Sequence, residues 1–479
     1  MIKKYIGVVF VKKSRILSLV TALVLVGCLF SGCGKKNDDS NVTTISVWSP
    51  NSHSKTIVTK LVDNYNETEG KKKGIAIDYK IIEGDAYAQS LELAMQTGQG
   101  PDLVDSATLK LKSAVENGYV TAFEDIEGGM DTLKKLMDTY NLTDSDFMEF
   151  THKYKNKIYA IPENVTTRAL IYNKDMFKKA GLVDEKGEPV PPETFDELRE
   201  YAKKLTNKAE NKFGIIFPMK WSGWVGSDIV TLLESSVGHN GFNPVTGEYD
   251  YSGMAPIINA YMGMIEDNSV YPGSEGIDND TARAYFAEGM VGMKIAYSFD
   301  VGVLNDQFPA KCDWGVAPLP VIDKNHKYLQ RQSVGASFAV NTASIPSKGA
   351  DKLLEVVSFF AGKEMATELY KHGASLPYKW DMVKDVELGS DAKKGWKEFA
   401  ELAAISAATN PAPQADMTGF ATLPERVIND VFSGKVSAED MVKQYNADMT
   451  AGTKKYYEVN GNEYDSLDMY INKDWNIER

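Results

Sequence analysis

Two tryptophans three residues apart lie in the segment M-K-W-S-G-W-V-G, directly after an apolar run that predicts a strand. Small residues separate Trp221 from Trp224. An indole ring can stack on the apolar C–H face of a sugar ring, whose hydroxyls need planar polar partners. We therefore predict that at least one of these rings contacts a ligand, while the other remains a candidate for the core.

Polar side chains follow the strands predicted for the first part of the chain. Strand patterns at 43–48, 75–82 and 102–104 alternate with helical patterns at 55–65 and 87–96, which indicates an α/β unit with a largely parallel sheet. Ligands of such sheets lie beyond the carboxyl ends of the strands. The rule nominates Asn51, His53, Tyr87, Asp105 and Ser106 as ligand-binding residues. Each could instead be a solvated loop residue or, for the serine and the aspartate, a helix cap.

The sequence shows no motif for metal-dependent or nucleophilic catalysis. The five histidines are scattered, without H-E-x-x-H or another paired spacing, and no G-x-S-x-G, Walker loop or G-x-G-x-x-G occurs. Asp278, Asn279 and Asp280 begin like a calcium loop, but Arg283 stands where that loop needs glycine. Acidic residues are plentiful, so a glycosidase carboxylate pair stays open as an alternative. We expect no catalytic residue, no metal and no cofactor.

One stretch is suited to carry the chain between two lobes. It runs from Tyr159 to Leu182, YAIPENVTTRALIYNKDMFKKAGL. A proline near its start cannot sit inside a helix or a central strand ladder, and the β-branched, apolar run 165–172 predicts a buried strand. Asn173 is placed to cap the helix that follows. Further along, Thr194 with a glutamate three residues on predicts a capping box.

Two sequence segments resemble the crossover segment of the extracellular solute-binding proteins of ABC sugar importers, the maltose-binding-protein-like group. They are K-I-Y-A-I-P and L-I-Y-N-K-D-M-F-K-K-A-G-L. Three further segments are also similar to that family and occur in the same order along the chain: A-M-Q-T-G-Q-G-P-D-L-V, P-P-E-T-F-D-E-L and G-A-S-F-A-V-N. The resemblance implies an α/β, two-lobe periplasmic-binding-protein-like fold of type II. Each lobe would be a mainly parallel sheet flanked by helices, and hinge strands would join the lobes.

The resemblance also implies further ligand-binding residues. In that family the hinge strands border the cleft, and the ends of several other strands face it. The matching positions are Glu163 and Asn164 at the crossover, Tyr297, Phe299 and Asp300 after the strand near 290–295, Arg331 before the second hinge strand, and Phe420 as a C-terminal stacking aromatic. Phe299 lies near where the family often has tryptophan, and would be a weaker stacking face.

The same resemblance divides the chain into segments. We expect a signal peptide over 1–32, a tether over 33–42, a first lobe from 43–162 and 336–386, a second lobe from 163–335, and C-terminal helices over 387–479 mainly on the second lobe.

The first residues resemble a targeting segment and not part of a folded domain. A basic region precedes the apolar run Ile16–Phe30, which is too short for a comfortable transmembrane helix. Ser31 and Gly32 then precede Cys33, which resembles a bacterial lipoprotein signal with Cys33 as the lipidated residue. Cys28 is a second match, and an uncleaved anchor helix is the alternative to cleavage. Lipidation would hold the protein at the outer face of the cytoplasmic membrane of a Gram-positive bacterium.

Charge and cysteine content limit the partners. The net charge is −13, and the first 32 residues hold five basic and no acidic residues, so the remainder carries −18. This balance argues against nucleic acid but says little about a neutral ligand. If Cys33 is lipidated, Cys312 is the sole remaining thiol, so no intramolecular disulfide can form. We expect a monomer.

The resemblance implies a receptor that closes on a carbohydrate, an oligosaccharide by expectation, and delivers it unchanged to the transmembrane subunits of an ABC permease. Two alternatives stay open: a receptor of the same fold for a polyamine, a peptide or a sugar phosphate, and a surface glycan hydrolase. A cationic ligand would need a carboxylate-rich cleft, and an anionic one arginine or helix N-termini. The mixture of aromatic rings with a few polar groups favours a neutral sugar.

Overall fold

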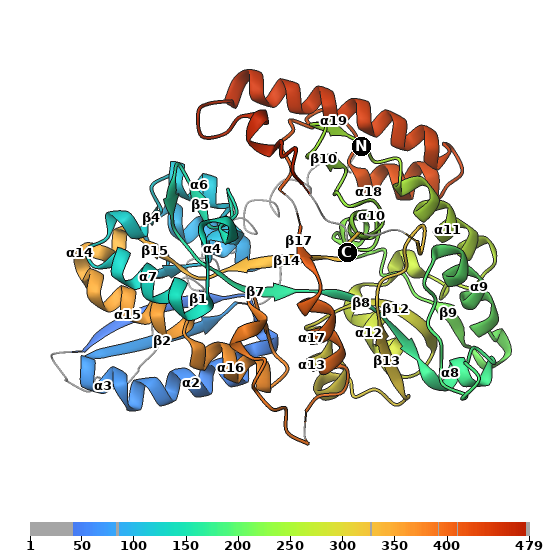
Figure 1. The fold of residues 1–479 in the computed structure, drawn as a ribbon, viewed down its shortest axis with the longest axis horizontal. Helices are drawn as coiled ribbons and strands as arrows, with labels where there is room; N and C mark the ends of the chain where they lie inside the picture. The colour runs from blue at the N-terminus through green and yellow to red at the C-terminus, as the bar shows by residue number, and fades with distance from the viewer. Residues whose placement is uncertain (1–41, 83–85, 326–327, 391, 410, 476–479) are drawn as a thin grey trace, which may run out of the picture. The chain divides into compact units, whose positions relative to one another are not determined.

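The computed structural model describes residues 42–82, 86–325, 328–390, 392–409 and 411–475 (Figure 1). The expected signal segment, Cys28, Cys33 and most of the tether lie outside these residues. From Thr43 onward the chain forms one compact unit. In the described ranges no helix is both long enough and apolar enough to cross a bilayer.

The first sheet has five strands in the order β2-β1-β3-β15-β4. Their bounds are Thr43–Ser49 for β1, Ile75–Ile81 for β2, Leu103–Val104 for β3, Val120–Thr121 for β4 and Ala339–Asn341 for β15. β1, β2 and β3 run parallel, as the alternation of strand and helix patterns predicts. Their carboxyl ends therefore lie at one edge, where the short helices η2, Ser52–Ser54, and α5, Ser106–Leu109, begin.

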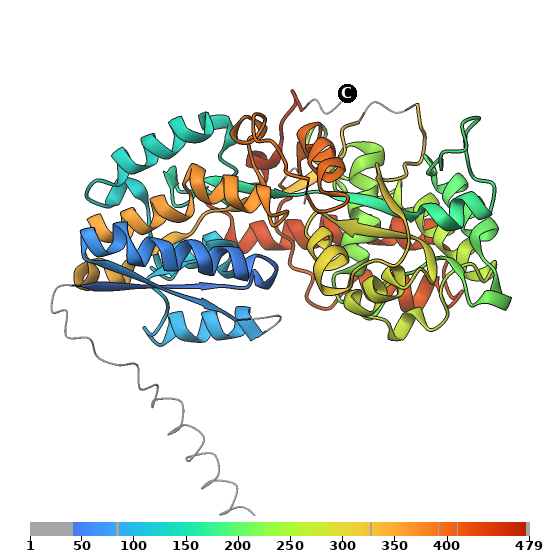
Figure 2. The ribbon, with the colours of Figure 1, turned by 90° about the horizontal axis from the view of Figure 1, so that it is seen from below.

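Helices cover both faces of this sheet. Figure 2 shows α2, Lys55–Glu67, and α4, Ala86–Gln96, on opposite sides of the strands. Because side chains alternate across a strand, Ile45 and Val47 enter the core beneath α2, whereas Trp48 packs against the apolar cluster beneath α4. Further helices of this half are α6, Leu111–Glu116, α7, Gly129–Tyr140, α15, Ala350–Phe360, and α16, Lys363–Lys371.

The crossover predicted as one strand is divided in two. β7, Pro162–Thr166, and β8, Arg168–Asn173, are separated at Thr167, which is fully buried and accepts a hydrogen bond from the backbone N–H of Ser298 at 3.0 Å. β7 belongs to a small sheet between the halves, in the order β16-β7-β14-β17, whereas β8 enters the second sheet. The remaining strands of the small sheet are β14, Arg331–Ala336, β16, Leu376–Pro377, and β17, Ala407–Ala408.

The second sheet has the order β13-β8-β12-β9. Its other strands are β9, Phe213–Ile215, β12, Val291–Tyr297, and β13, Trp314–Ala317, and β12 is buried along its whole length. Helices around it are α8, Lys174–Lys179, α9, Phe195–Leu205, α10, Thr231–Val237, α11, Met254–Glu266, α12, Asn279–Ala287, and α17, Trp396–Ala404. A short hairpin forms from β10, Phe242–Asn243, and β11, Glu248–Tyr249.

The second sheet departs from the expected, mainly parallel pairing. β8 runs antiparallel to β12 and β13, and among the described strands β12 pairs in parallel with β9. The first sheet contains the same reversal, since β15 is antiparallel to β3 and β4. The crossover explains both cases. A strand that arrives from the other half enters at the edge facing that half and runs away from it, while its neighbours end at that edge.

The C-terminal part is less helical than expected. α17 packs on β8 and β13, and the long α19, Ala438–Asn460, packs on α11, so both lie on the second half. Between them lie β17, a short α18, Leu423–Glu425, and a π-helical turn, η11, Arg426–Val431. Beyond α19 the chain returns to the first half, where Asp465 pairs with Lys112 at 2.5 Å.

Candidate functional site

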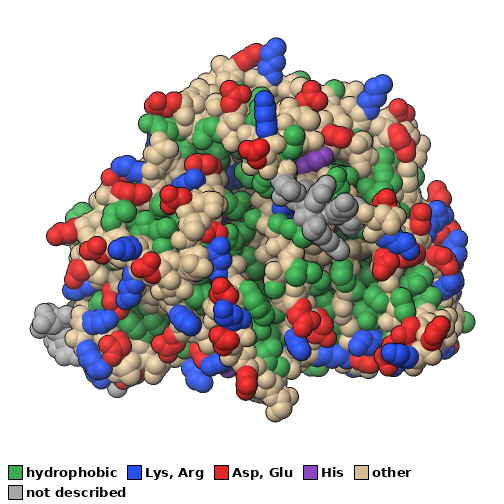
Figure 3. Space-filling view, viewed as in Figure 1, with side chains coloured by type: hydrophobic (Ala, Val, Ile, Leu, Met, Phe, Trp, Pro, Cys, Tyr) green, Lys and Arg blue, Asp and Glu red, His purple; other side chains and the backbone are tan. Residues whose placement is uncertain are grey.

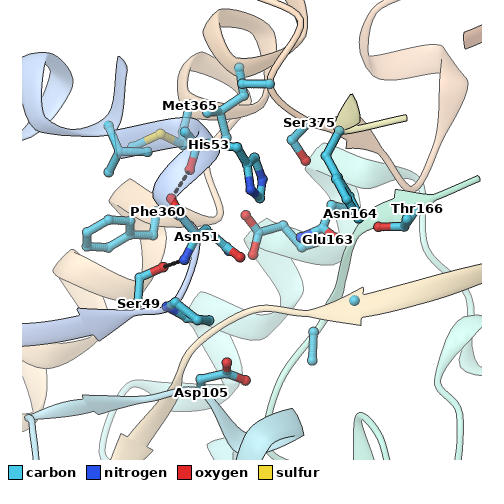
Figure 4. Close-up of a pocket in the computed structure, with 18 of the residues that line it drawn as sticks. Ser49, Asn51, His53, Asp105, Glu163, Asn164, Thr166, Phe360, Met365 and Ser375 are labelled. Atoms are coloured by element: carbon cyan, nitrogen blue, oxygen red, sulfur yellow. Dashed lines mark hydrogen bonds between the residues drawn. The ribbon is translucent and has the colours of Figure 1, made fainter. Parts of the chain in front are cut away.

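A cavity of about 300 Å³ lies where the two sheets and the hinge strands meet. The first half contributes the turn after β1 and the start of α5, the hinge contributes β7 and β14, and the second half contributes the turn after β12. Figure 4 shows Asn51, His53 and Glu163 directed into one space. On the molecular face seen in Figure 3, acidic and basic side chains are interspersed and form no large patch of one sign.

The turn after β1 presents Asn51 and His53 to this cavity. Pro50 follows the strand directly, and the hydroxyl of Ser49 accepts a hydrogen bond from the backbone N–H of Asn51 at 3.2 Å. The hydroxyl of Ser54 donates to the backbone carbonyl of Asn51 at 3.1 Å. These bonds hold the backbone of Asn51 in place. The Asn51 carboxamide makes no hydrogen bond to another described residue, so it is available to a ligand.

Asp105 has two roles. It caps α5, where one carboxylate oxygen accepts from the backbone N–H groups of Ala107 and Thr108 at 3.1 and 3.2 Å, and the other accepts from the Thr108 hydroxyl at 2.8 Å. It also lines the cavity. The helix-cap interpretation and the ligand interpretation are therefore compatible. Ser106, the next residue, is fully buried and does not line the cavity.

β7 places Glu163 and Asn164 at the bottom of the cavity. The backbone carbonyl of Glu163 accepts from Tyr378 at 2.9 Å, which fixes the strand. A Cβ on Gly335, in the neighbouring β14, would lie 2.4 Å from the Asn164 amide oxygen, so any larger residue there would displace the Asn164 side chain. Burial raises the pKa of Glu163 to about 8, and the nearby Asp105 carboxylate adds to this shift. At neutral pH the side chain is therefore mostly a neutral acid that can both donate and accept a hydrogen bond.

Aromatic rings form a continuous chain through the second half and into the first. Trp221 meets Tyr297 edge to face at 6.0 Å, Tyr297 stacks on Phe299 at 4.9 Å, and Phe299 stacks on His53 at 5.8 Å between ring centroids. A Cβ on Gly223 would lie 2.6 Å from the Trp221 ring, so the glycine lets this indole fold over its own turn. The predicted residues Trp221, Tyr297, Phe299 and His53 are thus brought together.

Asp300 supports this aromatic chain from behind. It is 1% exposed and accepts from the Arg283 guanidinium at 2.8 Å and from the backbone N–H of Tyr297 at 3.2 Å. Lys294, also buried, lies 3.8 Å away. These contacts fix the turn that carries Tyr297 and Phe299. Asp300 was expected among the ligand-binding residues, but the structure places it beneath the turn and outside the cavity lining.

Three polar side chains beside the rings have atoms without a hydrogen-bond partner. They are Arg168 at Nε, Asp228 at Oδ1 and Tyr297 at its hydroxyl. Arg168 lies over the Tyr297 ring at 5.1 Å, and Asp228 is on the π-helical turn η6, Gly226–Val230. Burial raises the pKa of Asp228 to about 7. Buried polar atoms are normally paired, but none of these three residues lines the cavity, so they support the aromatic chain and do not mark a ligand contact.

Sequence reasoning missed Arg168 and Asp228. A signal existed for Arg168, because it is a lone charged residue at the start of an otherwise apolar strand. Asp228 lies four residues after Trp224, in the segment that the paired tryptophans had already singled out. Neither signal specified which side chain would reach the aromatic chain, because that depends on how the turn folds against β12.

Seven expected ligand-binding residues other than Asp300 lie outside the cavity lining. Two of them, Trp221 and Tyr297, approach it only through their contacts with the ring of Phe299. Tyr87 is buried behind the first sheet and donates to the backbone carbonyl of Trp48 at 3.1 Å. Trp224 is 0% exposed and packs against Phe217, Tyr261 and Phe432, so it belongs to the core. The others are Ser106, Arg331, which is buried beneath Trp475 and donates to Ala408, and Phe420, which is half-buried in the segment before α18.

The described residues contain no cluster of three or more histidine, cysteine, aspartate or glutamate side chains that could hold a metal ion. The cavity instead combines amides, carboxyl groups, an imidazole and aromatic rings. Such a set can hold a polar, largely uncharged molecule by hydrogen bonds and stacking.

The chain has relatives among proteins that bind small molecules. A putative binding protein of Brucella abortus (strain 2308) is 24% identical over 70% of this chain and 80% of its own length. The maltotriose-binding protein of Pyrococcus abyssi (strain GE5 / Orsay) is 26% identical over 63% of this chain and 60% of its own length.

Solved structures identify the fold. The GacH receptor of Streptomyces glaucescens, described without ligand and in complex with acarbose, superposes with a TM-score of 0.63 at 17% identity, covering 87% of this chain and 99% of that one. The expected type II two-lobe fold is therefore confirmed. The model of the family named bacterial extracellular solute-binding protein matches residues 49–367, two thirds of the sequence, and the chain belongs to this family.

Proposed function

We propose that the protein is the extracellular receptor of an ABC importer and that it captures a sugar, an oligosaccharide by preference, in the cavity between its halves. The observation that carries the proposal is the ring of Phe299, supported by the rings of Tyr297 and Trp221, in one cavity with amide and carboxyl side chains of the first half and the hinge. Sugar rings offer apolar faces for stacking and hydroxyls for hydrogen bonds, and this cavity provides partners for both.

The mechanism follows from a cavity with one wall on each half. A ligand that contacts both walls is bound more tightly when the halves are closed, and it shifts the population toward that state by its differential affinity. The His53–Phe299 stack already joins the walls at 5.8 Å. The closed form would then present both halves to the transmembrane subunits of the permease, with the sugar unchanged. The lobes we propose are 43–162 with 336–386, and 163–335 with most of 387–479.

The charges around the cavity favour a neutral ligand. Both oxygens of Asp105 already accept hydrogen bonds from α5, and Glu163 is mostly protonated at neutral pH. A cationic ligand would therefore meet one carboxyl group that is engaged at α5 and one that is mostly protonated. Two arginines contact the aromatic chain: Arg168 lies over the Tyr297 ring, and Arg283, which is paired with Asp300, lies over the Phe299 ring. An anionic ligand would have to share the partly buried Arg168 with the Tyr297 ring.

Glu163 and Asp105 line one cavity, and two carboxyl groups in one cavity are the single respect in which the site resembles the acid pair of a glycoside hydrolase. Asp105 is nevertheless held as the cap of α5 by three hydrogen bonds to its carboxylate, which fix its orientation and weaken it as a nucleophile or base. We propose that the protein binds and does not hydrolyse. Incubation with oligosaccharides followed by chromatography checks this, and release of shorter products would contradict it.

A panel of mono- and oligosaccharides tests the proposal directly. Residues 43–479 are purified, and the melting temperature is measured with each sugar, since a ligand that binds only the folded state raises it. Calorimetry then gives the affinity for each positive sugar, with Phe299→Ala as the site variant. We expect at least one oligosaccharide to bind the wild type and to bind the variant more weakly. A panel without any binding sugar would refute the proposal.

We also propose that Cys33 carries the lipid anchor, with residues 33–42 as the tether. The support is the sequence pattern of a basic region, an apolar run and the small pair Ser31-Gly32 before that cysteine. Full-length protein is expressed in a Gram-positive host with labelled palmitate. We expect Cys33→Ala to lose the label and enter the medium, whereas Cys28→Ala stays membrane-bound. The opposite result would move the anchor to Cys28.

A further inference from the structure

A second cavity, of about 430 Å³, lies next to the first one. Ala107, the second residue of α5, lines both cavities, so they meet at this helix. The remaining lining comes from the α5–α6 junction, from the turn at Phe150 and from two C-terminal residues, Gln414 and Tyr456. The second cavity therefore continues the first beyond α5, between the first half and the C-terminal helix α19.

The wall formed by the C-terminal part is held by a buried ion pair. Asp465 is 0% exposed, accepts from Lys112 of α6 at 2.5 Å and accepts from the Tyr457 hydroxyl at 3.0 Å. Lys112 also donates to the Tyr456 hydroxyl at 3.0 Å. Because the partners of Lys112 lie on both sides of the end of α19, this end is fixed against the first half, and the Tyr456 ring is held in place.

The opposite wall is held by stacking. Phe150 stacks on Tyr470 with a centroid distance of 5.7 Å and an angle of 8° between the rings. Beyond Tyr470 the chain rejoins the second half, where the backbone N–H of Asn472 donates to the Pro244 carbonyl at 2.8 Å. The segment from the end of α19 to Asn472 thus touches both halves, and the second cavity is part of the region between them.

Two residues that line this cavity have strained backbones. Lys110 has φ 59° and Phe150 has φ 63°, in a region that residues with a side chain rarely adopt. Such strain costs folding free energy and is concentrated at functional sites. Lys110 makes no ion pair with another described residue, and the hydroxyl of Ser113 and the amide of Gln414 complete a lining of rings and hydrogen-bonding groups.

We propose that this cavity, the outer groove, binds the outer units of an oligosaccharide whose inner units occupy the first cavity. The inference rests on the proposed function and adds the ligand's length and direction: the chain runs from the hinge past Ala107 toward Tyr456. The chemistry is that of the first cavity, with ring faces at Phe150 and Tyr456 and amide and hydroxyl groups between them. A ligand of one or two units would leave the outer groove empty.

The test measures how the affinity depends on oligosaccharide length, in the wild type and in a variant whose new side chain fills the outer groove. Ser113→Trp adds an indole at an exposed position of the lining without removing a core contact. Ser145→Trp, at an exposed serine of the same half away from both cavities, is the matched control. Calorimetry uses malto-, xylo- and chito-oligosaccharides of two to six units, so that each series contains short and long members of one chemistry.

We expect the wild type to bind long members of the preferred series about tenfold more tightly than short ones, because the outer units add contacts. Ser113→Trp should remove this gain and leave the affinity for the shortest binding member unchanged, while Ser145→Trp behaves like the wild type. Tyr456→Leu keeps an apolar side chain and loses the stacking ring, so it should reduce the gain as well.

The outcomes separate the two proposals. If short and long sugars bind the wild type equally, or if Ser113→Trp changes their affinities by the same factor or not at all, the outer groove is refuted while the sugar receptor stands. If no member of any series binds the wild type, both proposals fail together.

Discussion

The two walls of the first cavity are built in different ways. The first-half wall combines apolar side chains such as Phe360 and Met365 with polar groups that are held within their own turns: Asn51 by Ser49 and Ser54, and Asp105 by the start of α5. The second-half wall presents the ring of Phe299, which is supported by Tyr297 and, through it, by Trp221, although Trp221 and Tyr297 lie far apart in the sequence.

This difference has an energetic consequence. A hydrogen bond to a ligand replaces one to water, so its net contribution is small, about 0.5–1.5 kcal/mol. A ring that covers an apolar face removes both surfaces from water, and aromatic contacts contribute beyond their buried area. We therefore expect the second-half wall to supply most of the affinity and the first-half wall to orient the ligand. The following changes test this division, from the largest expected effect to the smallest.

The largest effect is expected on stability, and it distinguishes the two tryptophans of the second half. Trp224→Ala empties a fully buried site and should lower the free energy of unfolding by about 3–5 kcal/mol. Trp221→Ala removes a half-buried ring and should mainly weaken binding. Urea denaturation and calorimetry on both variants measure this. A Trp224→Ala protein that unfolds at the wild-type midpoint but loses its ligand would reverse the assignment of the two rings.

The next change compares two phenylalanines that the sequence nominated alike. Phe299 lines the cavity and stacks on His53, whereas Phe420 lies outside the lining. Phe299→Ala should weaken sugar binding by about tenfold, the loss of one stacking face. Phe420→Ala should stay within about twofold of the wild type. If calorimetry gives equal losses, the aromatic chain extends beyond the rings described above.

The third change concerns the pH dependence that Glu163 introduces. The folded protein holds its proton more tightly than the unfolded chain, because the pKa rises from 4.5 to about 8. Stability should therefore fall as pH rises through the window between these values. Closing the halves buries the group further, so sugar affinity should also fall above pH 8. Glu163→Gln stays neutral, and both melting temperature and affinity should lose this dependence. An unchanged pH profile in the variant would show that another group titrates.

The smallest effect is expected on the polar groups of the first-half wall. Asn51→Ala removes one amide whose backbone is held independently by two serines, so the fold should be unaffected. We expect an affinity loss of about threefold, as for one hydrogen bond exchanged with water. Calorimetry on the sugar used for Phe299→Ala gives the comparison. A loss larger than that of Phe299→Ala would mean that hydrogen bonds, and not stacking, dominate binding.

Local signals in the sequence predicted many details of the fold correctly. Asn173 caps α8, with its side chain accepting from Met176 at 3.0 Å, and Thr194 caps α9 through Glu197 at 3.2 Å. The capping box at α9 is altered, because the Glu197 carboxylate accepts from the backbone of Glu193 and not from that of Thr194. Such interactions span three or four residues, so sequence patterns alone can specify them.

The polar groups of the first-half wall were predicted for the same reason. Asn51, His53 and Asp105 follow predicted strands, and parallel strands bring their carboxyl ends to one edge. Tyr87 and Ser106 were nominated by the same rule but lie in the core. The rule places a segment at the edge, yet the direction of each side chain depends on the local turn.

By itself, the sequence determined the alternation of strands and helices, the family and the part of the cavity that follows the strand ends, because all three are written in short-range patterns. Tertiary structure alone decided which tryptophan enters the core, why Asp300 supports the rings, and how Arg168 and Asp228 come beside them. It also decided that the C-terminal segment returns to Lys112 in the first half. Several of these arrangements join residues far apart in the sequence, as Arg168 with Tyr297 and Lys112 with Asp465, and such contacts form only when whole elements pack.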